Sequence, residues 1–217
     1  MFGRSALKLG LWAGCLGVAF IVGSAGLAGP AQAENKTAIF AGGCFWCIEK
    51  DFEHVAGVVD VVSGYTGGTN DNPTYRNHGR YGHREVVTVT YDSTKTTYAR
   101  LLEIFWRSVD PVDGGGQFCD RGHSYSPAIY AVDAEQLAEA QAQKAALDAS
   151  GKLGKPIATE IALAQKVTPA EDYHQDYYKK NPVRYKYYRY RCGRDQRVKA
   201  LWGADAYTGV THIKRAS

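Results

Sequence analysis

Hydrophobic and polar positions alternate along the chain in a way that predicts short strands and amphipathic helices. Thr37–Ala41 is a β-type run that ends at Gly42-Gly43. Ile48, Phe52 and Val55 then recur at i, i+4 and i+7, on one face of a helix. The same reasoning predicts further strands and helices: strands at 58–63, 85–91, 128–132 and 159–167, and helices at 98–109, 133–149 and 195–202.

The order of these elements predicts the fold class. It gives a β-α-β-β-α-β series, so we expect an α+β fold with a ferredoxin-like split βαβ core. The last fifty or so residues show weaker periodicity and include a Tyr-rich basic segment at 185–191. We expect them to form a long irregular C-terminal extension. Polar loops at 66–83 and 117–126 interrupt the core, and such loops commonly carry functional groups.

The first 33 residues have the pattern of a secretory signal peptide. A short basic start precedes apolar, uncharged residues 9–28, and Ala31-Gln32-Ala33 ends the segment. A membrane anchor is the alternative, but the Gly, Ala and Pro content suits a membrane span poorly. We expect cleavage after Ala33, a single domain at 34–217, and an exported protein, periplasmic or secreted, without stable membrane association after cleavage.

Charge and length narrow the classes of protein further. The chain carries a net charge of +4, and two of its basic residues lie in the expected signal peptide. The remainder is close to neutral and has no basic run ahead of the tail, so nucleic-acid binding is not expected. The length left after cleavage suits one domain with its own core, and we expect a monomer.

Four cysteines remain after the expected cleavage: Cys44, Cys47, Cys119 and Cys192. An even number in an oxidising compartment is compatible with two structural disulfides. The C-x-x-C spacing of the first two is also typical of a redox motif. A zinc site would need a second close ligand pair, which the spacing does not supply, so no metal is expected. The count alone leaves the structural and the redox interpretations open.

Cys44 lies where two glycines lead from a strand into the first helix. A helix N-terminus presents free amide N–H groups and the positive end of the helix dipole, which lower the pKa of a thiol. We therefore expect Cys44 to be a nucleophile. Phe45 and Trp46 add aromatic surface beside the sulfur, suited to an apolar substrate group. The alternative is that Cys44 is a small buried hydrophobic residue.

The motifs around and beyond Cys44 carry a family resemblance. In order they are GGCFWC (42–47), SGYTGG (63–68), NPTY (72–75), GHRE (82–85), FWRSVDP (105–111), GGQFCDRG (115–122), PAIY (127–130), EDYHQDYY (171–178) and YRCGRD (190–195). This series resembles the A-type peptide methionine sulfoxide reductases over nearly all of the expected mature chain. The resemblance implies a single catalytic domain that reduces the S epimer of methionine sulfoxide, free or in oxidised proteins. It also implies an external thioredoxin-like dithiol as reductant and no bound cofactor.

The resemblance implies catalytic roles for four residues. Cys44 resembles the nucleophile that attacks the sulfoxide sulfur, and Glu85 resembles the acid that protonates its oxygen. Tyr75 and Tyr125 resemble the hydroxyls that hold this oxygen. The chemistry agrees, because oxide leaves sulfur only with a proton and a buried Glu has a raised pKa. Tyrosine hydroxyls can donate to a developing oxyanion.

The resemblance also implies a binding surface. Asp120 resembles the group that orients the main-chain amide of the substrate, and Phe45 and Trp46 resemble the pocket for the S-methyl group. The chain departs from the usual pattern at Arg84 and Val86, beside the expected acid, and at His123-Ser124-Tyr125-Ser126. These departures affect the expected positioning of the substrate, not the expected reaction.

The expected sulfenic acid on Cys44 needs a second thiol to condense with it. Cys47 is the first candidate for this resolving thiol, because it lies one helical turn away and closes the smallest loop. Cys192 follows closely, because the family often recycles through a tail cysteine. Cys119 is the third candidate. A relay from Cys44 through Cys47 to Cys192 also remains open.

Two other classes of protein could use the same cysteines. A general disulfide oxidoreductase has C-x-x-C at a helix start but does not need Glu85. A non-catalytic secreted domain would hold Cys44–Cys47 and Cys119–Cys192 as permanent disulfides. Activity of a Cys44→Ser variant on methionine sulfoxide separates the three classes.

Overall fold

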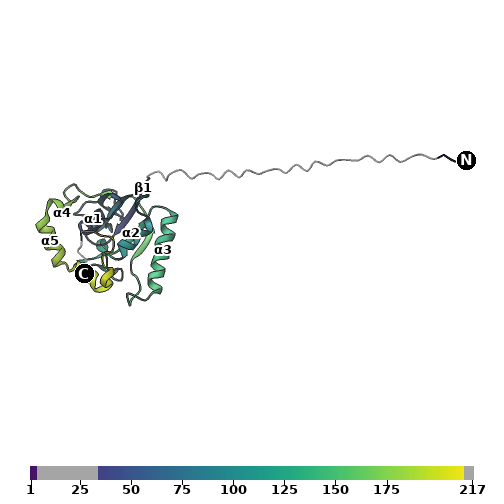
Figure 1. Cartoon of the computed structure of the whole chain (residues 1–217). Helices are drawn as coiled ribbons and strands as arrows, with labels where there is room; N and C mark the ends of the chain where they lie inside the picture. Colours follow the sequence, from purple (N-terminus) through teal and green to yellow (C-terminus); the bar gives the residue numbers. More distant parts are fainter. Residues whose placement is uncertain (4–33, 213–217) are drawn as a thin grey trace. The chain divides into compact units, whose positions relative to one another are not determined.

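The computed structural model describes residues 1–3 and 34–212 (Figure 1). The signal peptide expected at 1–33 lies outside the described residues, apart from its first three. No helix in the part of the chain that is described combines the length and the apolar character needed to cross a bilayer. The main elements of the core follow in chain order: β1 (Asn35–Ala41), α1 (Phe45–Glu53), β2 (Val58–Thr66), β3 (Arg84–Asp92), α2 (Tyr98–Trp106), β6 (Ala128–Ala131) and α3 (Ala134–Ala149).

The sheet confirms the expected α+β fold. Its strand order is β7-β6-β1-β3-β2-β8, where β7 is Glu160–Leu163 and β8 is Thr168–Pro169. The four central strands β6, β1, β3 and β2 pair with one another in antiparallel fashion, as in a split βαβ core. β7 extends this sheet as a parallel partner of β6. The crossover helix α3 between these two strands lies on the opposite side of the domain from α5 (Figure 1).

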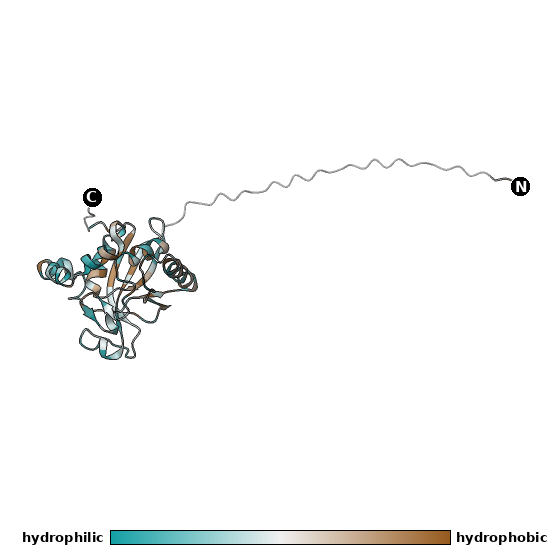
Figure 2. Ribbon diagram, turned by 90° about the horizontal axis from the view of Figure 1, so that it is seen from below, coloured by the Kyte–Doolittle hydropathy of each residue, from teal (hydrophilic) through white to brown (hydrophobic). Residues whose placement is uncertain are grey.

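Aromatic packing fixes the first two helices on the sheet. The ring of Phe40 on β1 stacks on Phe52 of α1 with centroids 4.9 Å apart, and on Phe105 of α2 with centroids 5.0 Å apart. Both helices therefore cover the same face of the sheet. Figure 2 shows hydrophobic residues concentrated in the sheet, and polar residues dominating α5 and the outer turns. Burial of aromatic and aliphatic area between these layers is the main favourable contribution to the stability of the fold.

The C-terminal extension is mostly helical, so the expectation of an irregular extension was wrong in this respect. It contains α4 (Tyr177–Lys180), α5 (Pro182–Arg191) and α6 (Arg194–Trp202). The hydrophobic pattern did not reveal α5 because its buried residues, Tyr185 and Arg189, are polar. Arg189 is buried in a bidentate ion pair with the fully buried Asp51 of α1. Charge pairing therefore takes the place of the apolar stripe that sequence periodicity detects.

The two polar loops contain short ordered elements. The first includes a 3-10 helix, η1 (His78–Tyr81). The second forms a small hairpin of β4 (Gly116–Gln117) and β5 (Asp120–Arg121), followed by the 3-10 turn η2 (His123–Tyr125). Both loops lie near the start of α1, because Tyr75 of the first loop and Tyr125 of the second line the same pocket as Cys44.

Candidate active site

Cys44 is the N-cap residue of α1 and is 6% exposed. The turn that leads into it depends on Gly43, whose φ of 86° lies in the left-handed region. A Cβ on Gly43 would also come within 2.6 Å of the side chain of Gln117. The structure thus confirms the expected strand, glycine turn and helix start at Cys44.

A small pocket of about 50 Å³ surrounds Cys44. It brings together seven of the site residues that the sequence predicted, from four separate parts of the chain. An eighth residue, Tyr188 of α5, was not predicted. The available signal was its place in the Tyr-rich segment ahead of Cys192. The lining residues are Cys44, Phe45, Trp46, Tyr75, Glu85, Asp120, Tyr125 and Tyr188.

Glu85 is suited to donate a proton. Its side chain is 2% exposed, and burial raises the pKa of its carboxyl group to about 8. One oxygen, Oε2, accepts a hydrogen bond from the backbone N–H of Phe45 at 3.0 Å. The other, Oε1, lies 3.8 Å from Nε2 of His78, whose own pKa is lowered by burial. Glu85 is therefore a neutral acid at pH 7, tied to the first turn of the helix that carries Cys44.

The thiols of Cys44 and Cys47 form a coupled pair. Burial raises the pKa of Cys44 well above its ordinary value, in contrast to the lowered pKa expected from the helix start. A hydrogen bond with Cys44 lowers the pKa of Cys47 to about 7, and the guanidinium groups of Arg194 and Arg189 add to this effect. Of the two thiols, Cys47 therefore ionises more readily than Cys44. Desolvation of Cys44 outweighs the helix N-terminus in this arrangement.

Two tyrosine hydroxyls face the same space. Burial raises the pKa of Tyr75 to about 12 and raises the pKa of Tyr125 further, so both remain protonated donors near neutral pH. The backbone N–H of Tyr75 donates to Glu171 Oε1 at 3.0 Å. The hydroxyl of Tyr65 donates to the other oxygen of Glu171 at 3.0 Å. This carboxylate therefore anchors the loop that brings Tyr75 to the pocket.

The indole of Trp46 is held on two sides. It stacks on Tyr177 with centroids 3.7 Å apart and an interplanar angle of 6°. Its Nε1–H donates to Nδ1 of His174 at 3.0 Å. His174 therefore sets the orientation of a pocket residue. Together with the buried ring of Phe45, Trp46 gives the pocket a fixed aromatic wall.

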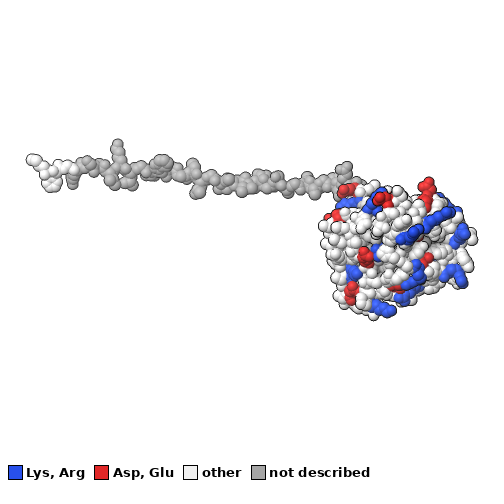
Figure 3. All heavy atoms as spheres, turned by 180° about the vertical axis from the view of Figure 1, so that it is seen from behind, with Lys and Arg blue, Asp and Glu red and all other residues white. Residues whose placement is uncertain are grey.

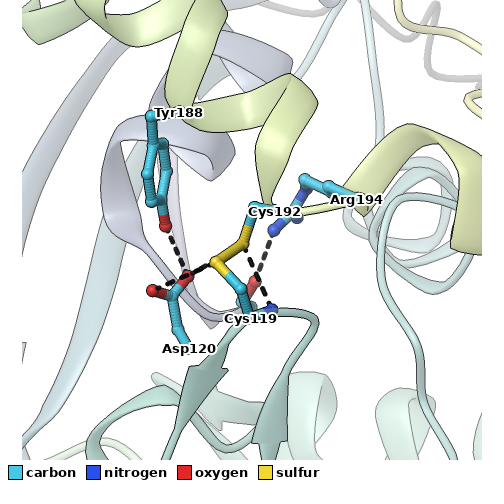
Figure 4. Close-up of a disulfide and its surroundings, with 6 residues drawn as sticks. Cys119, Asp120, Tyr188, Cys192 and Arg194 are labelled. Carbon is cyan, nitrogen blue, oxygen red and sulfur yellow. Dashed lines mark hydrogen bonds between the residues drawn. A yellow bond between two sulfur atoms is a disulfide. The ribbon is translucent and has the colours of Figure 1, made fainter.

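Asp120 lies between the pocket and a disulfide. Figure 4 shows the side chain of Tyr188 pointing to the Asp120 carboxylate, and its hydroxyl donates a hydrogen bond to Oδ2. The bond between Cys119 and Cys192 joins the hairpin to the end of α5 next to this carboxylate. Arg194 donates to the carbonyl of Gly42 at 3.0 Å, which ties α6 to the turn before Cys44.

The disulfide leaves Cys47 as the one free thiol among the three candidates for the resolving thiol. Cys119 and Cys192 are bonded to each other, whereas Cys44 and Cys47 are free and buried. Among the described residues, the group of side chains closest to a metal site is Cys119, Asp120 and Cys192. Its two sulfurs are joined in the disulfide, so neither is available as a thiolate ligand.

Two of the positions at which the chain departs from the usual motif pattern, Arg84 and Ser126, contact each other. Arg84 Nε donates to Ser126 Oγ at 2.8 Å, and Nη1 donates to the hydroxyl of Tyr130 at 2.8 Å. Nη2 pairs with Glu160 at 2.6 Å. The guanidinium therefore fastens η2, which carries Tyr125, to the sheet. Arg84 and Ser126 are thus paired with each other and do not line the Cys44 pocket.

Comparisons with known proteins agree with this site. Residues 36–206 match the family model described as peptide methionine sulfoxide reductase. The peptide methionine sulfoxide reductase MsrA 2 of Rhizobium meliloti (strain 1021) is 52% identical over 184 residues, which cover 84% of this chain and 92% of that protein. The MsrA of Listeria welshimeri is 49% identical over 169 residues, covering 77% of this chain and 96% of that protein.

Solved structures show the same fold. The methionine sulfoxide reductase A of Corynebacterium diphtheriae matches with a TM-score of 0.62 at 35% identity, over 69% of this chain and 76% of that one. Mxr1 from Saccharomyces cerevisiae in reduced form matches with a TM-score of 0.62 at 28% identity, over 70% of this chain and 91% of that one. As its motifs predicted, the chain belongs to the A-type peptide methionine sulfoxide reductases, a family of oxidoreductases that reduce methionine sulfoxide with thiols.

Proposed function

We propose that Cys44 attacks the sulfoxide sulfur while Glu85 delivers a proton to the oxygen. The observation that carries this assignment is that a buried thiol and a neutral buried carboxylic acid line one pocket of about 50 Å³. The attack forms a transient bond between the two sulfurs. As the oxygen passes to Cys44, this bond and the sulfur–oxygen bond of the substrate both break, and methionine leaves as the thioether. The oxygen remains on Cys44 as a sulfenic acid, so Cys44 is oxidised by two electrons and the substrate is reduced by two.

The remaining pocket residues position the substrate. Tyr75 and Tyr125 donate hydrogen bonds to the oxygen as negative charge develops on it. The aromatic wall of Phe45 and Trp46 receives the S-methyl group. Asp120 accepts the hydrogen bond of the substrate amide after its contact with Tyr188 opens. These roles follow the resemblance, and their support is that the side chains meet around one sulfur.

Cys47 prepares the nucleophile and then resolves the sulfenic acid. A proton that passes from Cys44 to Cys47 moves the negative charge onto the attacking sulfur. After the first step, the Cys47 sulfur attacks the Cys44 sulfur, the proton held by Cys47 passes to the departing hydroxide, which leaves as water, and a Cys44–Cys47 disulfide forms. Cys192 and Cys119 cannot take this part while they are bonded to each other. They become candidates only after reduction of their own disulfide.

An external dithiol of the thioredoxin type completes the cycle by reducing the Cys44–Cys47 disulfide. We further propose that residues 1–33 direct export and are removed, and that residues 34–217 act as one catalytic domain in the periplasm or outside the cell. Support for this is the apolar, uncharged run and the small residues at 31–33, together with a family match that begins at residue 36. We propose a monomer without stable membrane association after cleavage.

Single-turnover chemistry tests the proposed function. The wild-type protein receives one equivalent of N-acetyl-methionine S-sulfoxide, and methionine formation and cysteine oxidation are followed together by mass spectrometry. We expect one equivalent of the thioether and an oxidised Cys44. Cys44→Ser should form none while keeping the circular dichroism spectrum of the wild type. Turnover above a few per cent in a folded Cys44→Ser variant would contradict the assignment.

A further inference from the structure

An open groove of about 550 Å³ lies directly beside the Cys44 pocket. The two spaces share a wall made of Trp46, Tyr75 and Tyr188. The far wall is the exposed face of α5, with Arg184, Tyr187 and Arg191. We call this space the α5 groove. Its volume falls within the range of about 300–1,000 Å³ typical of ligand sites, whereas the Cys44 pocket is far smaller.

Trp46 in the shared wall is held in a fixed orientation, which suits it for binding. Trp46 is clamped between the Tyr177 stack and the His174 hydrogen bond. The ring of Tyr188 meets Trp46 edge-on, with centroids 5.8 Å apart. A ligand that enters the α5 groove therefore meets a preformed aromatic surface. Little of the free energy of binding is lost to ordering the side chains of this surface.

The chemistry of the α5 groove is apolar and aromatic with positive charge at its edge. Tyr187 is 66% exposed and Tyr173 is 56% exposed. Arg184 and Arg191 are exposed and form no ion pair with any residue that the structure describes, and no acidic residue lines the groove. Lys and Arg side chains also gather on the side of the molecule that carries α4 and α5 (Figure 3). Exposed arginines without partners attract carboxylates.

We propose that the α5 groove binds the polypeptide segment that flanks methionine sulfoxide in an oxidised protein. It favours segments in which an aromatic or aliphatic side chain neighbours the methionine sulfoxide and Asp or Glu follows further out. The flanking apolar side chain packs on Trp46 and Tyr187, and the carboxylates face Arg184 and Arg191. The inference rests on the proposed function, because the oxidised residue must occupy the Cys44 pocket for its neighbours to reach the groove.

The alternative is that the groove holds a free small molecule. Continuity with the Cys44 pocket argues against this, because a chain extending from the pocket must pass the shared wall. An extended chain rises about 3.3 Å per residue, so the neighbours of the oxidised residue lie within reach of the groove.

Three substrates test the proposal by their kcat/KM values. The first is a blocked pentapeptide with methionine S-sulfoxide between two Phe residues and Glu at both ends. The second has Lys in place of both Glu residues, and the third is N-acetyl-methionine S-sulfoxide. At low salt we expect the wild-type protein to prefer the Glu peptide over the Lys peptide by about tenfold, and the preference to shrink as salt screens it.

Variants on α5 locate the effect. The double variant Arg184→Glu/Arg191→Glu should abolish or reverse the preference for the Glu peptide. Tyr187→Ala should lower kcat/KM for both peptides severalfold. Lys186→Glu and Tyr190→Ala are the matched controls, since both residues are exposed on α5 but lie outside the groove. We expect activity of all these variants on N-acetyl-methionine S-sulfoxide to stay within about twofold of wild type.

The outcomes separate the two proposals. The α5 groove does not bind the flanking segment if the double variant keeps the wild-type ratio of kcat/KM for the Glu peptide to kcat/KM for the Lys peptide. The same conclusion follows if Lys186→Glu changes this ratio as strongly as the double variant does. If the wild-type protein reduces N-acetyl-methionine S-sulfoxide but does not discriminate between the peptides, only the groove proposal fails. If it reduces none of the three substrates, the proposed function fails first.

Discussion

The hydroxyl of Tyr188 donates a hydrogen bond to Oδ2 of Asp120. A residue of the C-terminal tail therefore already binds the carboxylate that we propose as the acceptor for the substrate amide. The contact joins α5 to β5 across 68 positions of sequence. Both residues line the Cys44 pocket, whose volume is only about 50 Å³. We therefore expect this contact to open when a substrate amide binds to Asp120.

Removing the hydroxyl should ease substrate binding. In Tyr188→Phe the ring still packs on Trp46, but Asp120 no longer has an internal donor to exchange for the substrate amide. One ordinary hydrogen bond contributes about 0.5–1.5 kcal/mol, so we expect KM for N-acetyl-methionine S-sulfoxide amide to fall by about two- to tenfold. Steady-state kinetics measure this. A higher KM would show instead that the Tyr188 hydroxyl itself binds the substrate.

The single-turnover rate should depend on pH through Glu85. The acid must be protonated to act, and the pKa of Glu85 is raised to about 8 by burial, so the rate should fall as pH rises through 8. On the acid side the thiol pair must hold a thiolate, and the pKa of Cys47 near 7 predicts a rise in rate through that pH. We therefore expect a bell-shaped profile with its maximum between pH 7 and 8.

Glu85→Gln is the matched variant for this profile. Gln keeps the shape but cannot release a proton, so the rate should fall by on the order of 10²-fold and lose its decline above pH 8. Rapid-quench measurement of methionine formation gives both quantities. An unchanged rate, or a decline above pH 8 that persists in the variant, would make Glu85 a structural residue.

Cys47 should determine what happens after the first step. In Cys47→Ser, one equivalent of substrate should leave Cys44 as a sulfenic acid that dimedone traps and mass spectrometry detects. Wild-type protein should lose two free thiols per turnover and give no adduct. The same assay on Cys192→Ser should still show the Cys44–Cys47 disulfide. If Cys47→Ser loses two thiols and recycles with thioredoxin at the wild-type rate, the tail cysteines resolve the intermediate.

The disulfide between Cys119 and Cys192 should stabilise the docked tail. It closes a loop with a sequence separation of 73 residues, and such links contribute about 2–4 kcal/mol. We expect Cys119→Ser/Cys192→Ser to lower Tm by on the order of 5–15 °C. Reductant should lower Tm of the wild-type protein by a similar amount and leave the double variant unchanged. Equal Tm values for the wild type and the double variant, both without reductant, would contradict this role.

Local patterns in the sequence were sufficient for the core and for most of the site. The glycine turn and the helix start at Cys44 follow from residues that are neighbours in the chain, because a glycine in the left-handed region and a 3.6-residue apolar pattern are local properties. The strands at 58–63 and 85–91 were predicted on the same basis and lie at 58–66 and 84–92. The family motifs then predicted Glu85, Tyr75, Tyr125 and Asp120 as members of one site.

Only the tertiary structure decided the features that depend on contacts between distant residues. α5 was not predictable because Arg189 is buried by its ion pair with Asp51, 138 positions away, and not by an apolar stripe. The position of Tyr188 over Asp120 and the pairing of Cys119 with Cys192 follow from that docking. The raised pKa of Cys44 likewise depends on burial, which many distant side chains produce together. Sequence determined which groups could react, and long-range packing decided their charge, their partners and their access to substrate.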